Sequence, residues 1–431
     1  MGRGIRTFGL FFSVFMLIAL AGCGRDSLCP QSDEEHSGDP LSQEILVSAN
    51  NDFAFRLFKE IVKAQSDSNI FISPLSVSMA LGMTMNGAGG STLDSMLMTL
   101  GFPGYSTESA DQCYRDLIDL LTGLDPEVLF EIANSIWGRS GVIFEAPFLE
   151  ACRTCFDAEV SSLDFDQPDA SDIINGWVDE KTHGKITEIV PKPIDPATMI
   201  ILVNAIYFLG NWQYQFDPAD TKDDWFHPPN EPKTPCRMMS RPQFPPPSDV
   251  TELLADYSVV LNDHFQAVDL PYGDSLFTMT LLLPRHGQDV DEIISWLNPD
   301  RWDSLTSSFH TCRGVLLMPR FELKYNLVMN DVLTALGMGE AFGDADFSEM
   351  CRSMALQITA VRHKTYVRVN EVGTEAAAVT EVECGPTSVP PECSSFTIKV
   401  DHPFMFVIRE RYTNTILFVG RVLNPGYFAE G

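Results

Sequence analysis

Cysteine is the residue type whose number and spacing in this chain most directly suggest chemistry. The chain contains ten cysteines, and Cys152 and Cys155 form a C-x-x-C pair. In a thioredoxin-like βαβ context such a pair would indicate a redox site. The flanking sequence shows no such context, and no second pair completes a zinc site. The pair is therefore predicted to be a helix-surface pair or a local disulfide, and no metal or cofactor is expected.

Cys23 follows a segment typical of an export signal. Arg3 and Arg6 precede a short apolar run at 8–20, which is too short to span a bilayer comfortably. The LAGC sequence at 20–23 resembles the bacterial lipoprotein signal, in which the cysteine thiol is lipidated and becomes the new N-terminus. An ordinary secretory peptide with a chance cysteine is the alternative.

This signal predicts the organisation and location of the chain. Residues 1–22 are assigned to the signal peptide, 23–46 to a flexible polar tether, 47–426 to one folded domain and 427–431 to a tail. A lipid on Cys23 would hold an exported protein at the bacterial cell envelope, on the periplasmic or outer surface. Export implies an oxidising compartment, which permits disulfides. Nine cysteines besides Cys23 leave at least one thiol unpaired or paired between chains.

The charge balance excludes several classes of partner. The formal net charge is -30 and the isoelectric point about 4.5. Such a surface repels phosphate backbones and lacks the basic patch that a heparin-type polyanion would need. No nucleic-acid partner is expected, and a monomer is expected.

No common enzyme motif is present. The sequence lacks a G-x-S-x-G elbow, an H-E-x-x-H pair, a Walker loop and a Rossmann glycine pattern after a strand. Serine, histidine and aspartate occur, but none lies in a local context that would activate a nucleophile. The chain is therefore predicted not to be an enzyme.

Hydrophobic periodicity places helices mainly in the first half and strands in the second, which predicts an α+β fold. Residues 51–64 and 75–85 have helical spacing, the second opening with Pro74 in the first turn. Strands are predicted at 199–208, 269–272, 277–283, 314–323 and 366–370, with a hairpin joining 404–408 to 416–419. The proline-rich stretch 242–247 is predicted to be a surface insertion, with a polyproline ligand as the alternative.

A series of short motifs resembles the serpin family across residues 49–425. The motifs are NIFISPLS at 69–76, NAIYFLGNW at 204–212, LPY at 270–272, MPRF at 318–321, HK at 363–364, DHPF at 401–404 and FVGRVLNP at 418–425. Each is modest alone, but their order and spacing are those of the family. The resemblance implies three β-sheets, eight or nine helices and an exposed reactive-centre loop at about 371–395.

The stretch EVGTEAAAVT at 371–380 resembles the hinge of an inhibitory serpin. After cleavage, the loop of such a protein inserts into the central sheet as a new strand. Because side chains of a strand alternate, Thr374, Ala376, Ala378 and Thr380 share the inward face, and all are small. Glu375 and Glu381 fall on the outward face. The hinge comprises Glu371, Gly373, Thr374, Glu375, Ala376, Ala377, Ala378, Val379 and Thr380, with Gly373 predicted to supply backbone freedom. An Ala-rich helix is the structural alternative.

The resemblance implies a suicide inhibitor of a serine-type endopeptidase, with a cysteine-type target as a variant. Counting from the hinge glutamate places the reactive bond between Thr387 and Ser388. A small, uncharged Thr387 suits an elastase-like or subtilisin-like pocket. Bonds after Cys384 or Val389 remain alternatives. A non-inhibitory serpin acting as a binding or folding factor is the alternative function.

The resemblance also assigns residues to two regions that control opening of the sheet. Ser73, Ser76, Asn204 and His363 match the shutter, and Trp212 matches the breach where insertion begins. For His363, a neutral buried side chain in a polar network is favoured over a pH switch or a catalytic base.

Two cysteines bracket the predicted reactive bond. Cys384 and Cys393 enclose the sequence GPTSVPPE, which weakly resembles the disulfide-closed loop of Bowman–Birk inhibitors. A bond between them would prevent full insertion, so the oxidised form would inhibit reversibly and the reduced form would act as a suicide trap. This loop disulfide is a hypothesis.

Overall fold

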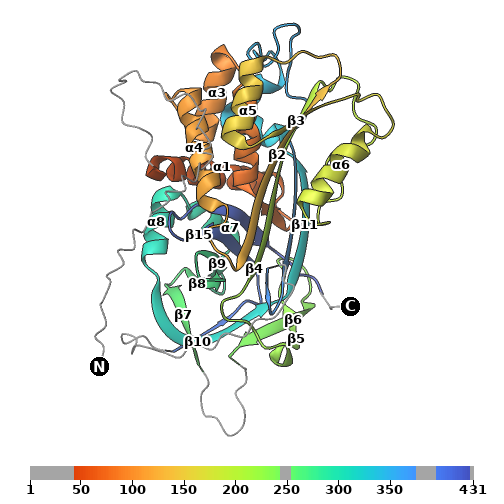
Figure 1. Cartoon of the computed structure of the whole chain (residues 1–431). Coiled ribbons are helices and arrows are strands. Elements are labelled where there is room, and N and C mark those ends of the chain that lie inside the picture. Colours follow the sequence, from red (N-terminus) through yellow and green to blue (C-terminus); the bar gives the residue numbers. More distant parts are fainter. Residues whose placement is uncertain (1–42, 243–253, 375–394, 428–431) are drawn as a thin grey trace, which may run out of the picture.

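The computed structural model describes residues 43–242, 254–374 and 395–427, with side chains from Val47 onward (Figure 1). The α-helices are α1 (Gln43–Ala64), α2 (Pro74–Met85), α3 (Gly90–Leu100), α4 (Thr107–Leu121), α5 (Ala146–Phe156), α6 (Ala170–Lys181), α7 (Val290–Trp296), α8 (Pro299–Ser307) and α9 (Asn330–Leu333). The signal segment and most of the predicted tether lie outside the described residues. Helix α1 begins at Gln43, inside the stretch assigned to the tether.

One sheet of six strands forms the centre of the fold. In spatial order its strands are β11 (Phe321–Val328), β12 (Arg362–Val369), β13 (Gly373–Thr374), β4 (Ile200–Asn211), β2 (Val128–Arg139) and β3 (Glu159–Leu163). All neighbouring pairs are antiparallel except β2 with β3. The short strand β13, which belongs to the predicted hinge, therefore lies between β12 and β4.

The remaining strands form a second continuous sheet. Its order is β1 (Ile70–Ile72), β16 (Ile416–Val422), β15 (Phe404–Glu410), β9 (Phe277–Pro284), β8 (Phe265–Tyr272), β7 (Ala255–Leu261), β10 (His310–Pro319), β6 (Thr234–Arg241) and β5 (Lys222–Phe226), with β14 (Phe396–Lys399) on β10. Three sheets were expected. The described residues form two sheets. Strand β10 pairs with β7 at one end and with β6 and β14 at the other, and it therefore joins these strands into one sheet.

Helix α2 is the buried centre of the helical layer. Its apolar and small hydroxyl side chains leave no wide polar face, and nearly every residue is buried. Ser73 caps its first turn by accepting a hydrogen bond from the Ser76 N–H, and Pro74 begins it. The helix packs against β4 and β16. On the other side of the central sheet, α6 covers a smaller core that includes Trp137, Ile174 and Val203.

Several predicted elements differ from the observed ones. The predicted strand 314–323 is divided at Arg320, because β10 belongs to one sheet and β11 to the other. The long strand β2 was not predicted, because Glu131, Asn134 and Ser135 interrupt its apolar pattern. The α2, β4, β9 and β15–β16 predictions are confirmed within a few residues. Residues 243–253, with most of the proline-rich stretch, lie outside the described part.

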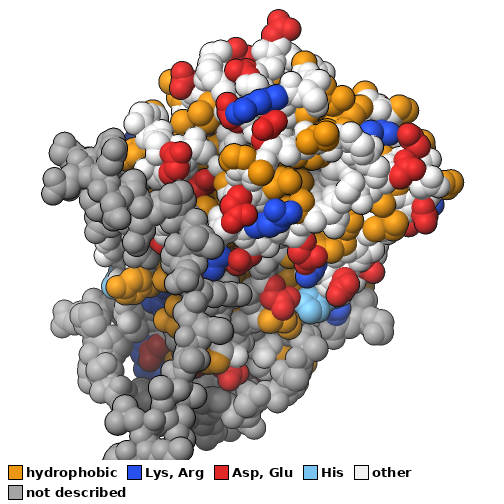
Figure 2. Space-filling model, turned by 45° about the horizontal axis from the view of Figure 1, so that its top comes forward, with side chains coloured by type: hydrophobic (Ala, Val, Ile, Leu, Met, Phe, Trp, Pro, Cys, Tyr) orange, Lys and Arg blue, Asp and Glu red, His pale blue; other side chains and the backbone are white. Residues whose placement is uncertain are grey.

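Charges on the visible surface are mixed. On the face drawn in Figure 2, Lys and Arg side chains stand apart from one another among acidic and apolar ones, so no basic patch forms there. Among the helices that the structure describes, none combines the length and the apolarity needed to cross a bilayer.

Candidate functional site

The chain turns sharply between β12 and β13. The Asn370 N–H donates to the Gly373 carbonyl at 3.0 Å, and Asn370 Oδ1 accepts hydrogen bonds from Val372 N at 3.0 Å and Gly373 N at 3.2 Å. An asparagine side chain stabilises such a turn because its oxygen replaces a backbone acceptor. The turn directs Thr374 back along Val369 and against Gly210 of β4.

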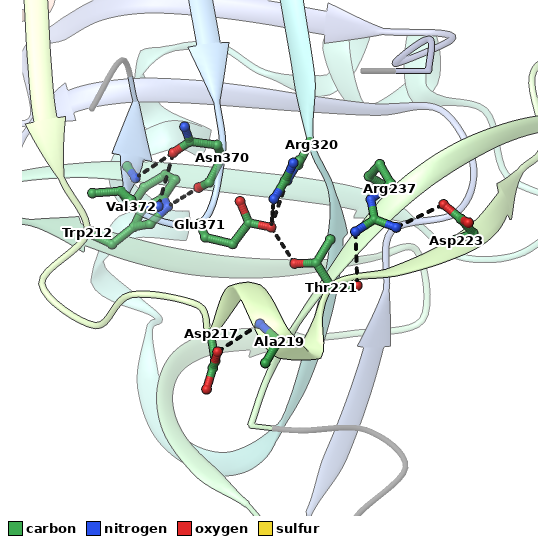
Figure 3. Close-up of polar contacts among 11 residues, drawn as sticks. Trp212, Asp217, Ala219, Thr221, Asp223, Arg237, Arg320, Asn370, Glu371 and Val372 are labelled. Carbon is green, nitrogen blue, oxygen red and sulfur yellow. Dashed lines mark hydrogen bonds and ion pairs between the residues drawn. The ribbon is translucent and has the colours of Figure 1, made fainter. Parts of the chain in front are cut away.

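Glu371 anchors this turn through a buried ion pair (Figure 3). Arg320 Nε and Nη2 each lie 2.7 Å from Glu371 Oε1, and the two side chains are 8% and 3% exposed. The Thr221 hydroxyl donates to the same oxygen, and Phe216 N–H donates to the Glu371 carbonyl at 3.0 Å. Because a buried carboxylate without its cation is strongly unfavourable, this pair holds the base of the hinge in place.

Trp212 fixes the other side of the turn. Its indole Nε1–H donates to the Asn370 carbonyl at 2.9 Å, and its backbone N–H donates to the Val372 carbonyl at 2.8 Å (Figure 3). The indole stacks on Tyr272 with ring centroids 4.6 Å apart. The Tyr272 and Thr374 hydroxyls are 2.5 Å apart and both residues are buried. The predicted breach residue therefore contacts the hinge directly.

The structure shows a steric reason for glycine at position 373. Gly373 is not among the glycines with positive φ. A Cβ at this position would lie 2.1 Å from the Gly210 carbonyl oxygen. Glycine is needed here because two backbones approach closely.

A slot separates β4 from β12 beyond the hinge. In the described residues β13 pairs with both strands, but no ladder joins β4 directly to β12. A cavity of about 250 Å³ lies along the slot and is lined by α2, β4 and the start of β12. A smaller pocket of about 30 Å³, lined in part by Tyr207, Tyr366 and Thr374, continues it toward the hinge. Cavities therefore lie between β4 and β12 next to the hinge.

The four predicted shutter residues meet at the wall of this cavity. Ser73 N–H donates to His363 Nε2 at 3.0 Å, and Ser73 Oγ donates to the Leu417 carbonyl at 2.8 Å. Ser76 Oγ donates to the Asn204 carbonyl at 3.4 Å. Because Nε2 accepts a hydrogen bond, His363 is neutral, and burial lowers its pKa to about 4. The interpretation as a neutral buried histidine fits this geometry.

Asn204 carries an unused acceptor. Its Nδ2 donates to Asn134 Oδ1 at 2.8 Å, while its own Oδ1 is buried without a hydrogen-bond partner. An unpaired buried oxygen costs about 1–3 kcal/mol. The side chain lines the cavity beside His363, so a hydroxyl donor placed in the slot would relieve this cost.

The sequence prediction missed residues that hold the hinge. Arg320, Tyr272 and Thr221 bind Glu371 or Thr374, and Asn370 shapes the turn. The MPRF and LPY motifs contained the first two without indicating their roles. The predicted residues Glu375, Ala376, Ala377, Ala378, Val379, Thr380, Cys384, Thr387, Ser388, Cys393 and Cys23 lie outside the described residues.

The prediction for the C-x-x-C pair is wrong. Cys152 is a buried free thiol, whereas Cys155 is buried and disulfide-bonded, so the two do not bond to each other. Both face the interior because α5 packs its apolar side against α2 and α4. Burial raises the pKa of the Cys152 thiol, which makes it a poor nucleophile.

One cluster among the described residues has metal-binding side chains. Ligand atoms of His286, Asp401 and His402 lie within 4.8 Å of one another. Both ring nitrogens of His402 already have partners, since Nδ1 is 2.9 Å from Asp401 and Nε2 is 2.9 Å from the Pro284 carbonyl oxygen. The Asp401 hydrogen bond, acting against burial, raises the pKa of His402. Within this cluster, Asp401 and His402 form an ion pair.

The fold places a sharp turn at 370–373 beside cavities between two strands of the central sheet. Comparison with known proteins identifies the family. The family model described as serpin (serine protease inhibitor) matches residues 48–425. The chain belongs to the serpin family.

Individual relatives share most of their length with this chain. Human Serpin B8 is 34% identical over 389 residues, which cover 88% of this chain and 99% of Serpin B8. The crystal structure of Tengpin, a thermophilic serpin, in the native state has a TM-score of 0.76 and 29% identity, covering 88% of this chain and 94% of Tengpin. The structure of human thyroxine-binding globulin in complex with thyroxine has a TM-score of 0.77 and 28% identity. The match covers 89% of this chain and 100% of that protein.

Proposed function

We propose that this serpin is a suicide inhibitor of a serine-type endopeptidase, with a cysteine-type enzyme as a variant target. The protease nucleophile attacks the carbonyl carbon of Thr387. The bond to Ser388 breaks, its nitrogen leaves as a protonated amine, and Thr387 remains esterified to the enzyme. Insertion of the freed hinge then distorts the protease, and loss of oxyanion-hole geometry slows deacylation by about 10²–10³-fold.

The observation that carries this proposal is the register of β13. Thr374 lies opposite Gly210 of β4 and Val369 of β12. Because β13 is antiparallel to both strands, each residue inserted after Thr374 would pair with the preceding residue of β4 and the preceding residue of β12. Position 380 then lies between Asn204 and His363.

This register gives the inward hinge residues specific partners. Thr380 is the hydroxyl-bearing inward side chain farthest from the turn, and it arrives beside the unpaired Oδ1 of Asn204. The hydroxyl can donate to that oxygen. In this register the small inward Ala376 and Ala378 would lie opposite Phe208 and Ile206 of β4.

The outward face is complementary in charge. The same register places Glu375 opposite Arg368 and Glu381 opposite Arg362 of β12. Opposite charges across a pair of strands contribute roughly 0.2–1 kcal/mol each. Since a slip of one residue would put every glutamate on the core face, both charge pairs favour the productive register.

The test combines a protease panel with two hinge variants. The wild type is incubated with elastase-like, subtilisin-like and trypsin-like proteases. A covalent complex on denaturing gels and a released C-terminal fragment beginning at Ser388 are expected. Thr380→Arg should still be cleaved but should form at least tenfold less complex. Ala377→Arg puts the same side chain on the outward face, opposite Tyr207 and Tyr366 and away from both charge pairs, and should retain most of the complex.

Two results would count against the trap. Equal complex yield from Thr380→Arg and the wild type would refute insertion at this register. A cut protein with unchanged thermal stability and no bound protease would favour the alternative, a serpin acting as a binding or folding factor. Thyroxine-binding globulin, whose structure contains thyroxine, supports keeping that alternative.

The location of the protein is a separate part of the proposal. The LAGC sequence ending at Cys23 supports lipid attachment at the bacterial cell envelope, with the folded domain exposed for a protease. Intact-mass measurement of the membrane fraction should show acylation, and Cys23→Ser should release the protein from membranes. An unmodified, freely soluble wild type would overturn this assignment.

A further inference from the structure

Three side chains with nitrogen or oxygen ligand atoms meet where β9 ends and where β14 leads into β15. His286 lies two residues after β9, and Asp401 and His402 lie in the connection between β14 and β15. Their ligand atoms lie within 4.8 Å of one another. The His286 and His402 rings stack with centroids 4.9 Å apart. The fold therefore brings the three side chains together, although no local sequence motif contains all of them.

The hydrogen bonds of His402 determine which of its nitrogens can bind a cation. Nε2 lies 2.9 Å from the Pro284 carbonyl oxygen, and because this oxygen can only accept, Nε2 carries a hydrogen. Nδ1 lies 2.9 Å from Asp401 Oδ1. In a neutral imidazole with its hydrogen on Nε2, Nδ1 is an acceptor and faces the carboxylate oxygen. Two acceptors at this distance repel each other unless a cation lies between them. A proton on Nδ1 serves this purpose in the ion pair described above, and a metal ion can use the same two lone pairs.

We propose that the cluster is a binding site for a divalent transition-metal ion, for which zinc is the best match. The ligands are Nδ1 of His402, a carboxylate oxygen of Asp401 and a ring nitrogen of His286, with water in the fourth position. When zinc binds, the Nδ1 proton passes to solvent and coordinate bonds replace the contact between Nδ1 and the carboxylate. This site does not depend on the proposed inhibition of a protease.

The surroundings of His402 are those of a metal-bound histidine. Such a histidine almost always donates its second ring N–H to a carbonyl or carboxylate, which orients the ring. The Pro284 carbonyl accepts from Nε2 in this way. The Asp401 and His402 side chains are each 15% exposed, and the His227 N–H donates to the Asp401 carbonyl at 2.7 Å. Two of the three ligands are therefore held in position before the metal binds.

A small adjustment completes the coordination. Zinc binds imidazole nitrogen and carboxylate oxygen at about 2.0–2.2 Å, so ligands of a tetrahedral ion lie about 3.3 Å apart. His402 Nδ1 and Asp401 Oδ1, now 2.9 Å apart, separate by about 0.4 Å. His286 is exposed and lies beyond the end of its strand, so rotation of its side chain brings its nitrogen to the same distance.

The charges and the ligand types favour zinc over the common alkaline-earth ions. The net charge of -30 raises the concentration of cations near the protein. Lys399 Nζ lies 3.8 Å from Asp401 Oδ2 but 2.8 Å from Asp224 Oδ2, so this lysine pairs mainly with Asp224 and leaves Oδ1 to the metal. Imidazole ligands suit zinc, copper and nickel, whereas magnesium and calcium prefer oxygen ligands.

Bound zinc links the end of β9 to the connection between β14 and β15. Among the described strands, β14 pairs with β10 alone. The connection after it is held to β10 by the hydrogen bond from the Val400 N–H to the Leu317 carbonyl at 2.9 Å. Coordination of Asp401 and His402 adds a second attachment. Because the unfolded chain does not bring the three ligands together, zinc stabilises the folded state.

The first test is isothermal titration of the full chain with zinc chloride after a chelator has removed bound metals. His286→Ala should weaken binding at this site at least tenfold. His310→Ala removes an exposed histidine outside the cluster and should bind zinc like the wild type. Zinc bound elsewhere on the chain appears in all three proteins and cancels in the comparison, and magnesium chloride should give no binding. Equal zinc affinity in His286→Ala and the wild type would overturn the proposal.

The second test identifies the ligands without changing the two partly buried ones. Cobalt(II), which is paramagnetic, is used in place of zinc, and the Cε1 protons of the histidines are followed by NMR. The His286 and His402 signals should shift or broaden strongly, whereas the His310 signal should not. The midpoint of thermal unfolding should rise with zinc concentration in the wild type and stay constant in His286→Ala. Unchanged His286 and His402 signals at saturating cobalt, or an equal rise of the midpoint in the variant, would refute the site.

Discussion

The shutter histidine predicts a measurable dependence of stability on pH. Burial lowers the pKa of His363 from 6.5 to about 4, so the folded protein favours the neutral imidazole. Between these pH values the unfolded chain binds more protons, and stability falls as the pH decreases. One pKa unit corresponds to 1.36 kcal/mol, which gives a loss of ~2 kcal/mol at pH 5 and ~3 kcal/mol below pH 4 relative to pH 7.5.

The structural reason is the hydrogen bond from the Ser73 N–H to Nε2. A protonated ring cannot accept this bond and places a positive charge in the wall of the cavity. His363→Gln keeps a carbonyl acceptor but cannot titrate. The variant should therefore lose about 2 kcal/mol less than the wild type between pH 7.5 and pH 5.

The assay is urea unfolding followed by tryptophan fluorescence at both pH values, together with NMR titration of the histidine Cε1 proton. Comparison with the variant cancels the other titrating groups. One of these groups is Asp111. Burial raises the pKa of its carboxyl to about 7, so its contribution to stability has the opposite sign to that of His363 and is lost as the pH rises. A His363 resonance that titrates near 6.5, or an equal pH 5 loss in His363→Gln, would refute the reasoning.

Three further predictions concern the hinge. Glu371→Ala removes the buried carboxylate that binds Arg320 and should lower the free energy of unfolding by ~3 kcal/mol, whereas a double change of both residues to Met should recover part of this loss in urea titrations. Gly373→Ala forces a Cβ to within 2.1 Å of a backbone oxygen, and it should speed amide exchange in β13 at least tenfold while the β15 amides stay protected. Trp212→Phe removes the donor to the Asn370 carbonyl and should cost ~1 kcal/mol of stability; an unchanged unfolding midpoint would show that this hydrogen bond contributes nothing.

Much of the fold follows from local sequence signals. The apolar run before Asn211 predicts β4, and Pro74 with its following apolar residues predicts α2, because burial on both faces leaves no polar side. The hinge pattern of small inward residues is equally local, since strand alternation alone assigns Thr374 and Thr380 to one face. The shutter residues were found through motifs, which identify positions without showing what each side chain contacts.

Contacts between segments that are distant in the sequence required the three-dimensional structure. Glu371 and Arg320 are separated by 51 residues, and nothing local to either residue indicates that they form a buried ion pair. The break at Arg320 arises because the chain leaves one sheet for the other there, and the need for Gly373 arises from the backbone of β4. The pairing of Thr374 with Gly210 and Val369 sets the register of the slot, because hydrogen bonds between strands depend on where the strands meet and not on either sequence alone.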